Sequence, residues 1–525
     1  MPSVLIADDL SPRALEVFGE RGIETEVRIG LKPAELAAAL NGHAGLAVRS
    51  AAKVTKDVLA AAKSLKVVGR AGIGVDNIDV PAATQRGIVV MNTPHGNSIT
   101  TAEHAIAMMM ALARQIPAAD KSTHAGKWEK SRFMGVELSG KTLGVVGCGN
   151  IGAIVADRGH GLKMRVLAFD PYLSEERARD LGVQKVELDD LLARADFITL
   201  HTPLTDSTRH MIDAKALAKM RRGVRLINCA RGGLIDEADL KIALESGQVA
   251  GAALDVFAEE PARANPLFGM DTVIATPHLG ASTAEAQEKV AIQVAEQMAD
   301  FLLTGAVSNA LNMPSVTAEE APRLRPYMAL AQLLGSFAGQ LTHSGLKGVT
   351  IEYEGHAAEI NTRPITAAAL AGLLTPLLDS VNMVNAPVLA RERNIEVTEI
   401  RHDRPGDYQT LMRLAVVTDR RSRDVAGTLF GGDKPRIVEI KGIRIEAELG
   451  RHMLYTTNED KPGFIGRLGT LLGESGINIA TFHLGRSAPG GDAIALIEVD
   501  QALGENLLAR VRAIPGVVQA ESLAF

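Results

Sequence analysis

The stretch LGVVGCGNIG, residues 143–152, decides the fold of the region around it. An apolar run leads into Gly147-x-Gly149-x-x-Gly152, the spacing found where a strand turns into a helix that binds a dinucleotide. The glycines permit a tight turn, bring the backbone close to a pyrophosphate, and let the helix pack against the strand. A helix beginning at Asn150 would point its free N–H groups at the anion. The stretch therefore predicts a dinucleotide-binding α/β unit.

Asp170 supplies the second half of this prediction. It ends the next apolar run, 166–169, where a carboxylate accepts both ribose hydroxyls of a dinucleotide and repels a 2′-phosphate. A glycine pattern alone arises wherever a tight turn needs glycine for steric reasons. The full order of strand, turn, helix, strand and terminal Asp favours a Rossmann-type domain that binds NAD rather than NADP.

Composition limits the number of domains, the kind of hydrophobic core and the classes of partner that the chain can have. A chain of 525 residues is too long for one hydrophobic core, and we expect about three or four domains. Hydrophobic residues make up 46% and aromatic residues only 3%, so aliphatic side chains and glycine build the cores, as in parallel α/β packing. The formal net charge of -6 leaves no basic stripe for a phosphate backbone, which argues against nucleic acid as a partner.

Two features indicate the cellular location. Cys148 and Cys229 are the only cysteines and lie in apolar segments rather than in a disulfide framework, which favours a reducing cytoplasm. No uninterrupted apolar run reaches the roughly 18 residues that a membrane span needs, and the N-terminal residues lack the basic region of a signal peptide. We expect a cytoplasmic protein with no membrane segment and no metal site.

The order of apolar and helical stretches predicts a discontinuous first domain. Short apolar runs alternate with Ala/Leu-rich stretches in residues 3–98, which indicates a parallel α/β unit. The four runs are 4–7, 45–48, 66–68 and 88–90. A helical stretch at 101–113 leads into the glycine stretch, and another at 284–303 is expected to return to the first unit. Pro314, Pro322 and Pro326 indicate a linker, followed by an α/β segment at about 327–448.

The last part of the chain predicts a separate small domain. From His452 the pattern is strand, helix, two strands, helix, strand, typical of a βαββαβ sheet with helices on one face. The predicted domains are a substrate-binding domain (1–98 and 283–312), an NAD-binding Rossmann domain (99–282), an α/β intervening domain (313–450) and the βαββαβ domain (451–525).

Candidate catalytic residues follow the cofactor stretch. Arg231 comes after an apolar run, at the expected carboxyl end of a strand, where a guanidinium can hold a substrate carboxylate and polarise the adjacent carbonyl. His278 follows another apolar run, and an imidazole can take an alcohol proton while a hydride leaves for the nicotinamide. A carboxylate on the other ring nitrogen would stabilise the imidazolium, and the spacing allows either Glu259 or Glu260 to supply it.

These stretches make the chain resemble the long form of the D-isomer-specific 2-hydroxyacid dehydrogenases. Besides the glycine stretch, the resemblance rests on VVGRAGIGVDN (67–77), NTPHGNS (92–98), NCARGG (228–233), EP (260–261) and TPHLG (276–280). It implies that Arg231 orients the substrate, that His278 is the proton donor, and that Glu260, directly before a proline, is the partner of the histidine.

The resemblance also implies which residues contact the cofactor and the substrate. Besides the glycines and Asp170, the implied cofactor contacts are Asn150, Ile151, Thr202, Cys229, Ala230, Asp255, Gly280 and Ala281. The implied substrate contacts are Arg49, Arg70, Gly96 and Asn97. Two arginines suit a phosphorylated acid, although both could be solvated surface charges. Ile73 stands where relatives often have threonine, so a hydroxyl contact to the cofactor at that position is lost.

The C-terminal segment resembles an ACT regulatory domain. The stretches NEDKPG (458–463) and GINI (476–479) follow its loop-helix-strand pattern. The resemblance implies that Asp460 and Asn478 contact an amino-acid effector such as L-serine where two such domains pair, and that the protein is a homo-oligomer, a dimer or tetramer. A domain that serves assembly alone fits the pattern equally well, because a fold does not imply its function.

The resemblance implies an enzyme that oxidises 3-phospho-D-glycerate to 3-phosphooxypyruvate with NAD, the first step of L-serine biosynthesis. One alternative is another reductase of the same family, acting on glyoxylate, hydroxypyruvate or 2-oxoglutarate. Such an enzyme would be indifferent to the loss of Arg49 and Arg70. The other alternative is an NAD-sensing binding protein that keeps the fold and lacks turnover.

Overall fold

The computed structural model describes residues 1–94, 96–317, 319–402 and 407–525. His95, in one of the segments quoted above, lies outside the described residues. The chain divides into unit 1, made of Met1–Arg70, Gly74–Asn92 and Val294–Phe525, and unit 2, made of Ala71–Ile73 and Thr93–Gln293. Across the described ranges, no helix combines the length and apolar character needed to cross a membrane.

Unit 2 contains a seven-stranded sheet in which all neighbouring strands are parallel. The chain enters the sheet at β6, adds β7 and β8 on one side, and then returns to build the other side from β9 to β12. This reversal beside β6 is the switch point at which doubly wound sheets bind dinucleotides. In spatial order the strands are β12 (Val273–Ala275), β11 (Val249–Leu254), β10 (Val224–Asn228), β9 (Phe197–Leu200), β6 (Thr142–Val146), β7 (Arg165–Phe169) and β8 (Gln184–Lys185).

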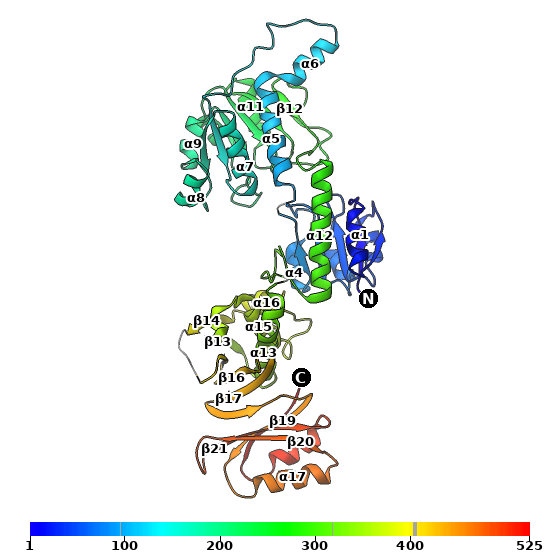
Figure 1. Cartoon of the computed structure of the whole chain (residues 1–525), viewed down its shortest axis with the longest axis vertical. Helices are drawn as coiled ribbons and strands as arrows, with labels where there is room; N and C mark the ends of the chain where they lie inside the picture. The colour runs from blue at the N-terminus through cyan, green and yellow to red at the C-terminus, as the bar shows by residue number, and fades with distance from the viewer. Residues whose placement is uncertain (95, 318, 403–406) are drawn as a thin grey trace. The chain divides into compact units, whose positions relative to one another are not determined.

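Helices cover both faces of this sheet. Apolar side chains of α5, α7 and α8 form the core on one face, and those of α9, α10 and α11 form the core on the other; Figure 1 labels most of these helices. The helices are α5 (Ser98–Arg114), α6 (Ile116–His124), α7 (Asn150–Gly161), α8 (Glu175–Asp180), α9 (Leu188–Arg194), α10 (Ala214–Lys219) and α11 (Glu237–Glu245). The next helix, α12 (Ala284–Thr304), runs from unit 2 into unit 1.

The N-terminal part of unit 1 is a five-stranded parallel sheet. The apolar runs predicted four of its strands, but β2 has no fully buried residue because it is a polar edge strand, and the sequence pattern missed it. In spatial order the strands are β2 (Glu24–Val27), β1 (Ser3–Ile6), β3 (Gly45–Val48), β4 (Val67–Arg70) and β5 (Val89–Met91). Its helices are α1 (Arg13–Glu20), α2 (Pro33–Ala39), α3 (Lys56–Ala61) and α4 (Val80–Gln85).

The middle part of unit 1 is a six-stranded sheet with helices on one side. Only the β13–β14 pair is parallel, and the other pairs are antiparallel. In spatial order the strands are β14 (Glu396–His402), β13 (Leu346–Gly355), β15 (Thr410–Thr418), β16 (Ser422–Phe430), β17 (Lys434–Ile440) and β18 (Ile443–Ala447). The helices are α13 (Ala321–Gln340), α14 (His356–Glu359), α15 (Arg363–Leu374) and α16 (Ala386–Glu392).

Helix α13 corrects the linker predicted from prolines. Pro322 lies in its first turn, where a missing N–H costs nothing, and Pro326 lies inside the helix. The helix continues because it packs closely against α15. A Cβ at Gly335 would come within 2.2 Å of the carbonyl oxygen of Ala369, so only glycine allows this backbone contact.

The C-terminal part of unit 1 has the predicted βαββαβ order. Its strands are antiparallel, and α17 and α18 pack on one face of the sheet through a core that includes Leu468, Leu472 and Leu508. In spatial order the strands are β20 (Ile479–Arg486), β21 (Asp492–Val499), β19 (His452–Glu459) and β22 (Val517–Ala524), and the helices are α17 (Phe464–Glu474) and α18 (Glu505–Arg512).

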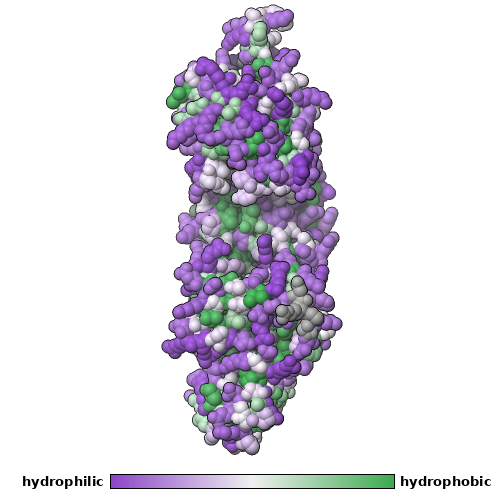
Figure 2. Space-filling view, turned by 90° about the vertical axis from the view of Figure 1, so that its left-hand side faces the viewer, coloured by the Kyte–Doolittle hydropathy of each residue, from purple (hydrophilic) through white to green (hydrophobic). Residues whose placement is uncertain are grey.

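Hydrophilic residues cover most of the face drawn in Figure 2. Two large hydrophobic side chains in the segment between α6 and β6 are nevertheless exposed. Trp128 is 86% exposed and Met134 is 80% exposed.

Candidate active site

The glycine stretch forms the turn between β6 and α7, as the sequence predicted. Gly147 has a φ of 88°, and a Cβ there would lie 2.6 Å from the carbonyl oxygen of His201 at the end of β9. A Cβ at Gly152 would lie 2.0 Å from the carbonyl oxygen of Gly147. Gly149, in contrast, faces open space, with nothing within 4 Å of a Cβ. The turn is therefore closed towards the protein and open at Gly149, which fits a pyrophosphate against the first turn of α7.

Asp170 lies directly after β7, beside this turn. Its Oδ2 accepts a hydrogen bond from Cys148 N at 2.8 Å, and its Oδ1 accepts one from Tyr172 N at 2.8 Å. Each carboxylate oxygen retains a further acceptor site, because an ionised carboxylate has about four. The half-exposed carboxylate can therefore accept ribose hydroxyls without losing the bonds that hold it.

The other predicted cofactor contacts lie at ends of neighbouring strands in unit 2. Thr202 is half-buried after β9, next to His201, whose pKa burial lowers to about 4. Ala230 is half-buried after β10. Cys148 and Cys229 are free buried thiols; burial raises the pKa of Cys148 to about 11 and also raises that of Cys229. Neither thiol is suited to act as a nucleophile, since the thiolate is the reactive form.

His278 and Glu260 form a short polar contact. His278 Nδ1 lies 2.6 Å from Glu260 Oε2, and Glu260 Oε1 accepts a hydrogen bond from Phe257 N at 3.1 Å. Burial acts to raise the pKa of Glu260, but the hydrogen bonds from His278 and Phe257 outweigh it and the pKa lies below its ordinary value. An ionised carboxylate can only accept, so Nδ1 carries the hydrogen and the neutral ring keeps its lone pair on Nε2.

The structure also distinguishes the two glutamates that spacing left open. Both glutamates are exposed, but it is Glu260 whose Oε2 lies 2.6 Å from His278 Nδ1. The side chain of His278 is 48% exposed, so its ring is supported on the Glu260 side and accessible to a ligand.

Arg231 lies on the loop after β10, and that loop is fixed from both sides. Asn228 Nδ2 donates to the carbonyl oxygen of Arg231 at 2.8 Å, and Asn228 Oδ1 accepts from Ala230 N at 3.0 Å. A Cβ at Gly232 would lie 1.8 Å from the carbonyl oxygen of Phe257. The Arg231 loop therefore rests against the loop that supports Glu260, and only glycine permits this contact.

The implied substrate contacts lie in both units. In unit 1, Arg49 follows β3 and Arg70 ends the adjacent β4, where Val48 is in register with Arg70, so the two arginines lie at neighbouring strand ends. In unit 2, Asn97 precedes α5 and is buried, and its Oδ1 has no hydrogen-bond partner in the described structure. A Cβ at Gly96 would lie 2.5 Å from Cγ1 of Val290 on α12, so the chain at Gly96 lies close to that helix.

The implied effector residues of the ACT-like part each bind a neighbour in the same fold. Asp460 accepts hydrogen bonds from Arg486 at 2.9 Å and from Gly490 N at 3.1 Å, and these contacts lower its pKa. Asn478 Nδ2 donates to Asp500 Oδ2 at 3.1 Å. An effector would have to exchange with these bonds or add to them.

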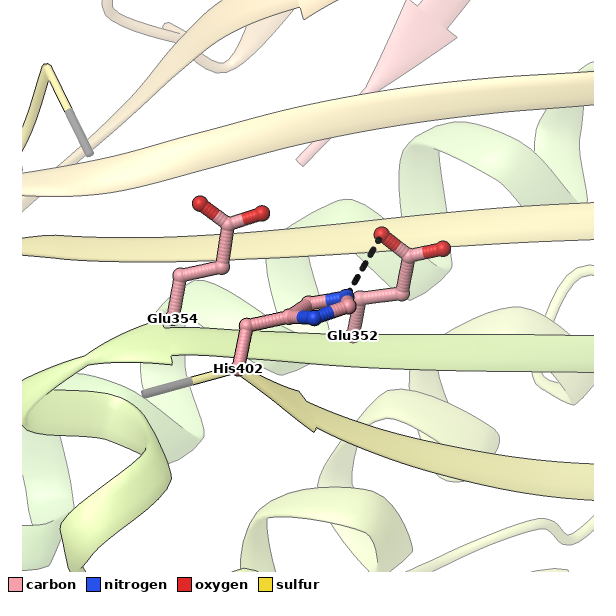
Figure 3. Close-up of side chains that lie close together, drawn as sticks. All are labelled: Glu352, Glu354 and His402. Carbon is pink, nitrogen blue, oxygen red and sulfur yellow. Dashed lines mark ion pairs between the residues drawn. The ribbon is translucent and has the colours of Figure 1, made fainter. Parts of the chain in front are cut away.

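Side chains of metal-ligand types converge at one place in the middle part of unit 1. Ligand atoms of Glu352 and Glu354 on β13 and of His402 at the end of β14 lie within 4.8 Å of one another (Figure 3). His402 Nε2 and the guanidinium of Arg413 each lie 3.9 Å from Glu352 Oε2. Arg413 also binds two further carboxylates of this face. We interpret the cluster as an ion-pair network, because a resident guanidinium already offsets its negative charge.

Sequence reasoning missed His104 on α5, which contacts the turn that carries His278. Its Nε2 lies 3.2 Å from Oδ1 of the buried Asp255. No local pattern could have found this pair, because a lone histidine on a helix carries no signal about a partner on a distant strand.

Comparisons with known proteins agree with this geometry. Residues 106–280 match the family model for the NAD binding domain of D-isomer specific 2-hydroxyacid dehydrogenases. A solved D-lactate dehydrogenase from Aquifex aeolicus, complexed with NAD and lactic acid, is 26% identical with a TM-score of 0.53, over 60% of this chain and 100% of that chain. The TT0316 protein from Thermus thermophilus is 34% identical with a TM-score of 0.55, over 59% of this chain and 99% of its own. The fold and the site thus define an NAD-dependent 2-hydroxyacid dehydrogenase.

The rest of the chain narrows this class. Residues 323–441 match the D-3-phosphoglycerate dehydrogenase intervening domain, and residues 452–516 match an ACT domain. The D-3-phosphoglycerate dehydrogenase of Synechocystis sp. is 44% identical over 99% of this chain and 94% of its own length. That of Bacillus subtilis is 43% identical over 99% of this chain and 98% of its own. The chain belongs to the D-3-phosphoglycerate dehydrogenase family.

Proposed function

We propose that the protein oxidises 3-phospho-D-glycerate to 3-phosphooxypyruvate with NAD, as the first step of L-serine biosynthesis in the cytoplasm. The observation that carries this proposal is the 2.6 Å contact between His278 Nδ1 and Glu260 Oε2, beside the loop of Arg231. The substrate follows from relatives named D-3-phosphoglycerate dehydrogenase that are 41–44% identical over nearly the whole chain.

His278 and Glu260 divide the proton chemistry between them. Glu260 holds the Nδ1–H, so Nε2 of His278 is the atom that takes the hydroxyl proton of the substrate. The ring becomes an imidazolium, and the Glu260 carboxylate stabilises that charge without taking the proton. In the reverse direction the same Nε2 returns the proton to the oxygen.

Arg231 and the glycine turn orient the reacting molecules. Arg231 holds the substrate carboxylate and stabilises charge on the neighbouring oxygen. The turn from Gly147 to Gly152 and the Asp170 carboxylate would hold NAD, which when bound accepts the hydride from C2. Asp170 also sets the preference against a 2′-phosphate.

The phosphate of the substrate is assigned to Arg49 and Arg70. Their place at adjacent strand ends of unit 1 supports this role, since two guanidiniums together suit a dianionic group. Each arginine replaced by alanine should raise KM for 3-phospho-D-glycerate about tenfold or more, which corresponds to the loss of a charge-assisted contact.

The test measures NADH formation with 3-phospho-D-glycerate, D-glycerate and D-lactate, using Arg86→Ala in unit 1 as the matched control. The proposal is supported if the wild type and the control turn over the phosphorylated acid in preference to the other two acids. Arg49→Ala and Arg70→Ala should lose this preference. Turnover with unphosphorylated acids only, unaffected by either replacement, would assign the protein to another reductase activity of the class.

We further propose that the protein is a homo-oligomer and that its ACT domain binds L-serine. The exposed Trp128 and Met134 support a contact between copies of the chain in this segment. Light scattering of Trp128→Glu against the wild type tests the first proposal, and a smaller particle is the expected result. Calorimetric titration with L-serine tests the second, with Asp460→Asn expected to weaken binding.

A further inference from the structure

A buried carboxylate holds the turn that carries His278. Asp255, directly after β11, is 0% exposed. Its Oδ1 accepts hydrogen bonds from Thr276 Oγ1 at 2.6 Å and Leu279 N at 2.7 Å, and its Oδ2 accepts one from Gly280 N at 2.8 Å. Its carbonyl oxygen accepts from His278 N at 2.9 Å. All four donors lie at or within two residues of His278, so Asp255 fixes the backbone on both sides of it.

His104 on α5 supplies a further contact to this carboxylate. Its Nε2 lies 3.2 Å from Asp255 Oδ1 and 3.4 Å from Thr276 Oγ1, and its side chain is 19% exposed. Burial acts to raise the pKa of Asp255, but His104 and the donors of the turn hold it below its ordinary value. A buried carboxylate needs such a partner, because removing water from an unpaired charge is costly.

A second bond joins the same face of α5 to the turn. Thr101 Oγ1 lies 3.0 Å from the carbonyl oxygens of both Gly280 and Asn97, which share its one hydrogen. Residues 101 and 104 lie three positions apart on α5 and therefore face the same way. The helix begins at Ser98, directly after Gly96 and Asn97. One helix face thus connects the segment proposed to contact the substrate with the turn of His278.

We infer that His104 is a positioning residue for the proton transfer: it holds the Asp255 carboxylate and, through it, the backbone on which His278 is placed. The inference rests on the proposed acid-base role of His278. His104 acts through Asp255 and not on the substrate itself. Its loss should lower kcat while leaving the KM for 3-phospho-D-glycerate nearly unchanged, because it perturbs the orientation of the reacting group rather than a contact to the substrate.

The experiment compares His104→Leu, which removes the donor, with His104→Gln, whose amide can still donate to Asp255. His160→Leu is the matched control, since His160 is a half-buried histidine on α7 in the same unit. We expect kcat to fall about tenfold in His104→Leu, since small displacements of a reacting group have effects of this order. The kcat of His104→Gln should stay within about threefold of the wild type, and the KM for 3-phospho-D-glycerate should stay within about twofold in both variants.

Two kinetic results with the His104 variants would each overturn the inference. One is a kcat in His104→Leu equal to that of the His160→Leu control. The other is an equal loss in His104→Leu and His104→Gln, which would point to side-chain shape rather than hydrogen-bond donation. If His104→Leu does not fold, Thr101→Val provides the second variant, because it removes the Oγ1 bonds to the carbonyl oxygens of Gly280 and Asn97. Unchanged kcat in that variant would count against a link through α5.

A readout independent of turnover separates this inference from the proposed function. Nitrogen-15 spectra of the His278 ring report which nitrogen carries the hydrogen. In the wild type the Nδ1–H form of the His278 ring should predominate. In His104→Leu this form should no longer predominate. Absence of wild-type turnover with 3-phospho-D-glycerate would reject the proposed substrate alone, whereas an unchanged His278 spectrum in His104→Leu would reject the positioning role alone.

Discussion

The turn around His278 and the loop around Asp460 both place a carboxylate beside a strand end, and they differ in how that carboxylate is held. Asp255 is fully buried and receives three hydrogen bonds from residues that flank His278. Asp460 remains accessible to solvent and binds Arg486 and Gly490 of a nearby hairpin. A buried carboxylate commits the backbone around it to one geometry. A solvated carboxylate can exchange partners at little cost.

This contrast matches two different requirements. Proton transfer needs a group held within a fraction of an ångström, and burial provides that rigidity. An effector site must change when its ligand arrives, and exposed, exchangeable bonds allow such a change. Replacements in the two regions should therefore differ in size and in kind.

The largest effect is expected for His278→Ala. Loss of the group that takes the hydroxyl proton should lower kcat about a hundredfold or more, the usual contribution of general acid-base catalysis. Binding of NAD, measured by fluorescence or calorimetry, should be unchanged, because the glycine turn lies elsewhere in unit 2. Turnover close to the wild type would remove His278 from the mechanism and with it the contrast between the regions.

The next largest effect is expected for Glu260→Gln. The amide can no longer stabilise the imidazolium, so kcat should fall about tenfold or more while KM changes little. Glu259→Gln is the matched control, since Glu259 is exposed and adjacent, and steady-state kinetics of the two variants make the comparison. Equal losses in both would contradict the assignment of Glu260 as the partner.

A moderate effect is expected for Asp170→Ala. Without the carboxylate that repels a 2′-phosphate, the ratio of kcat/KM for NAD over NADP should fall about tenfold. The ratio is measured with both cofactors at one substrate concentration. Continued exclusion of NADP would show that another group sets the cofactor preference.

Acid should lower the free energy of unfolding of unit 2, because it protonates the Glu260 carboxylate. Its pKa is lower in the folded protein than the ordinary value of 4.5, so the stabilisation is fully present above 4.5 and disappears as the pH falls through the folded pKa. The denaturant midpoints of the wild type and Glu260→Gln should therefore differ near neutral pH and become equal in acid. A difference in denaturant midpoint that stays constant down to the lowest pH would contradict this linkage.

The smallest effect on turnover is expected for Asp460→Asn. Because Asp460 lies in the ACT part of unit 1, kcat without effector should stay within about twofold of the wild type. Inhibition by L-serine, measured in the same assay, should weaken. A large loss of basal turnover would mean that the C-terminal loop is tied to catalysis, against the contrast drawn above.

Most of the proposed cofactor site could be predicted from short stretches of sequence. The glycine turn and Asp170 could be predicted because a strand, a turn and a helix lie within a short stretch, and the family match confirms the NAD-binding domain. The fold class and the ACT domain are likewise confirmed. The domain boundaries and the roles of individual residues stay predictions.

Features that depend on distant partners were out of reach. His104 meets Asp255 only because α5 packs against the sheet, and β2 is a polar edge strand that lacks an apolar run. Pro326 indicated a break, yet α13 continues because its glycines allow α15 to approach. In each case tertiary packing outweighed the local signal.

The two cysteines have a practical consequence for measuring the stability of unit 2. Both are buried free thiols in unit 2, and burial raises the pKa of each, so a thiol reagent can react only when that unit opens. Unit 1 contains no cysteine to compete for the reagent. The rate at which a reagent labels the thiols of the natural protein therefore reports the opening of unit 2 alone. The decrease in this labelling rate as NAD is added would measure how much the cofactor stabilises its own binding domain, and the measurement needs no mutation.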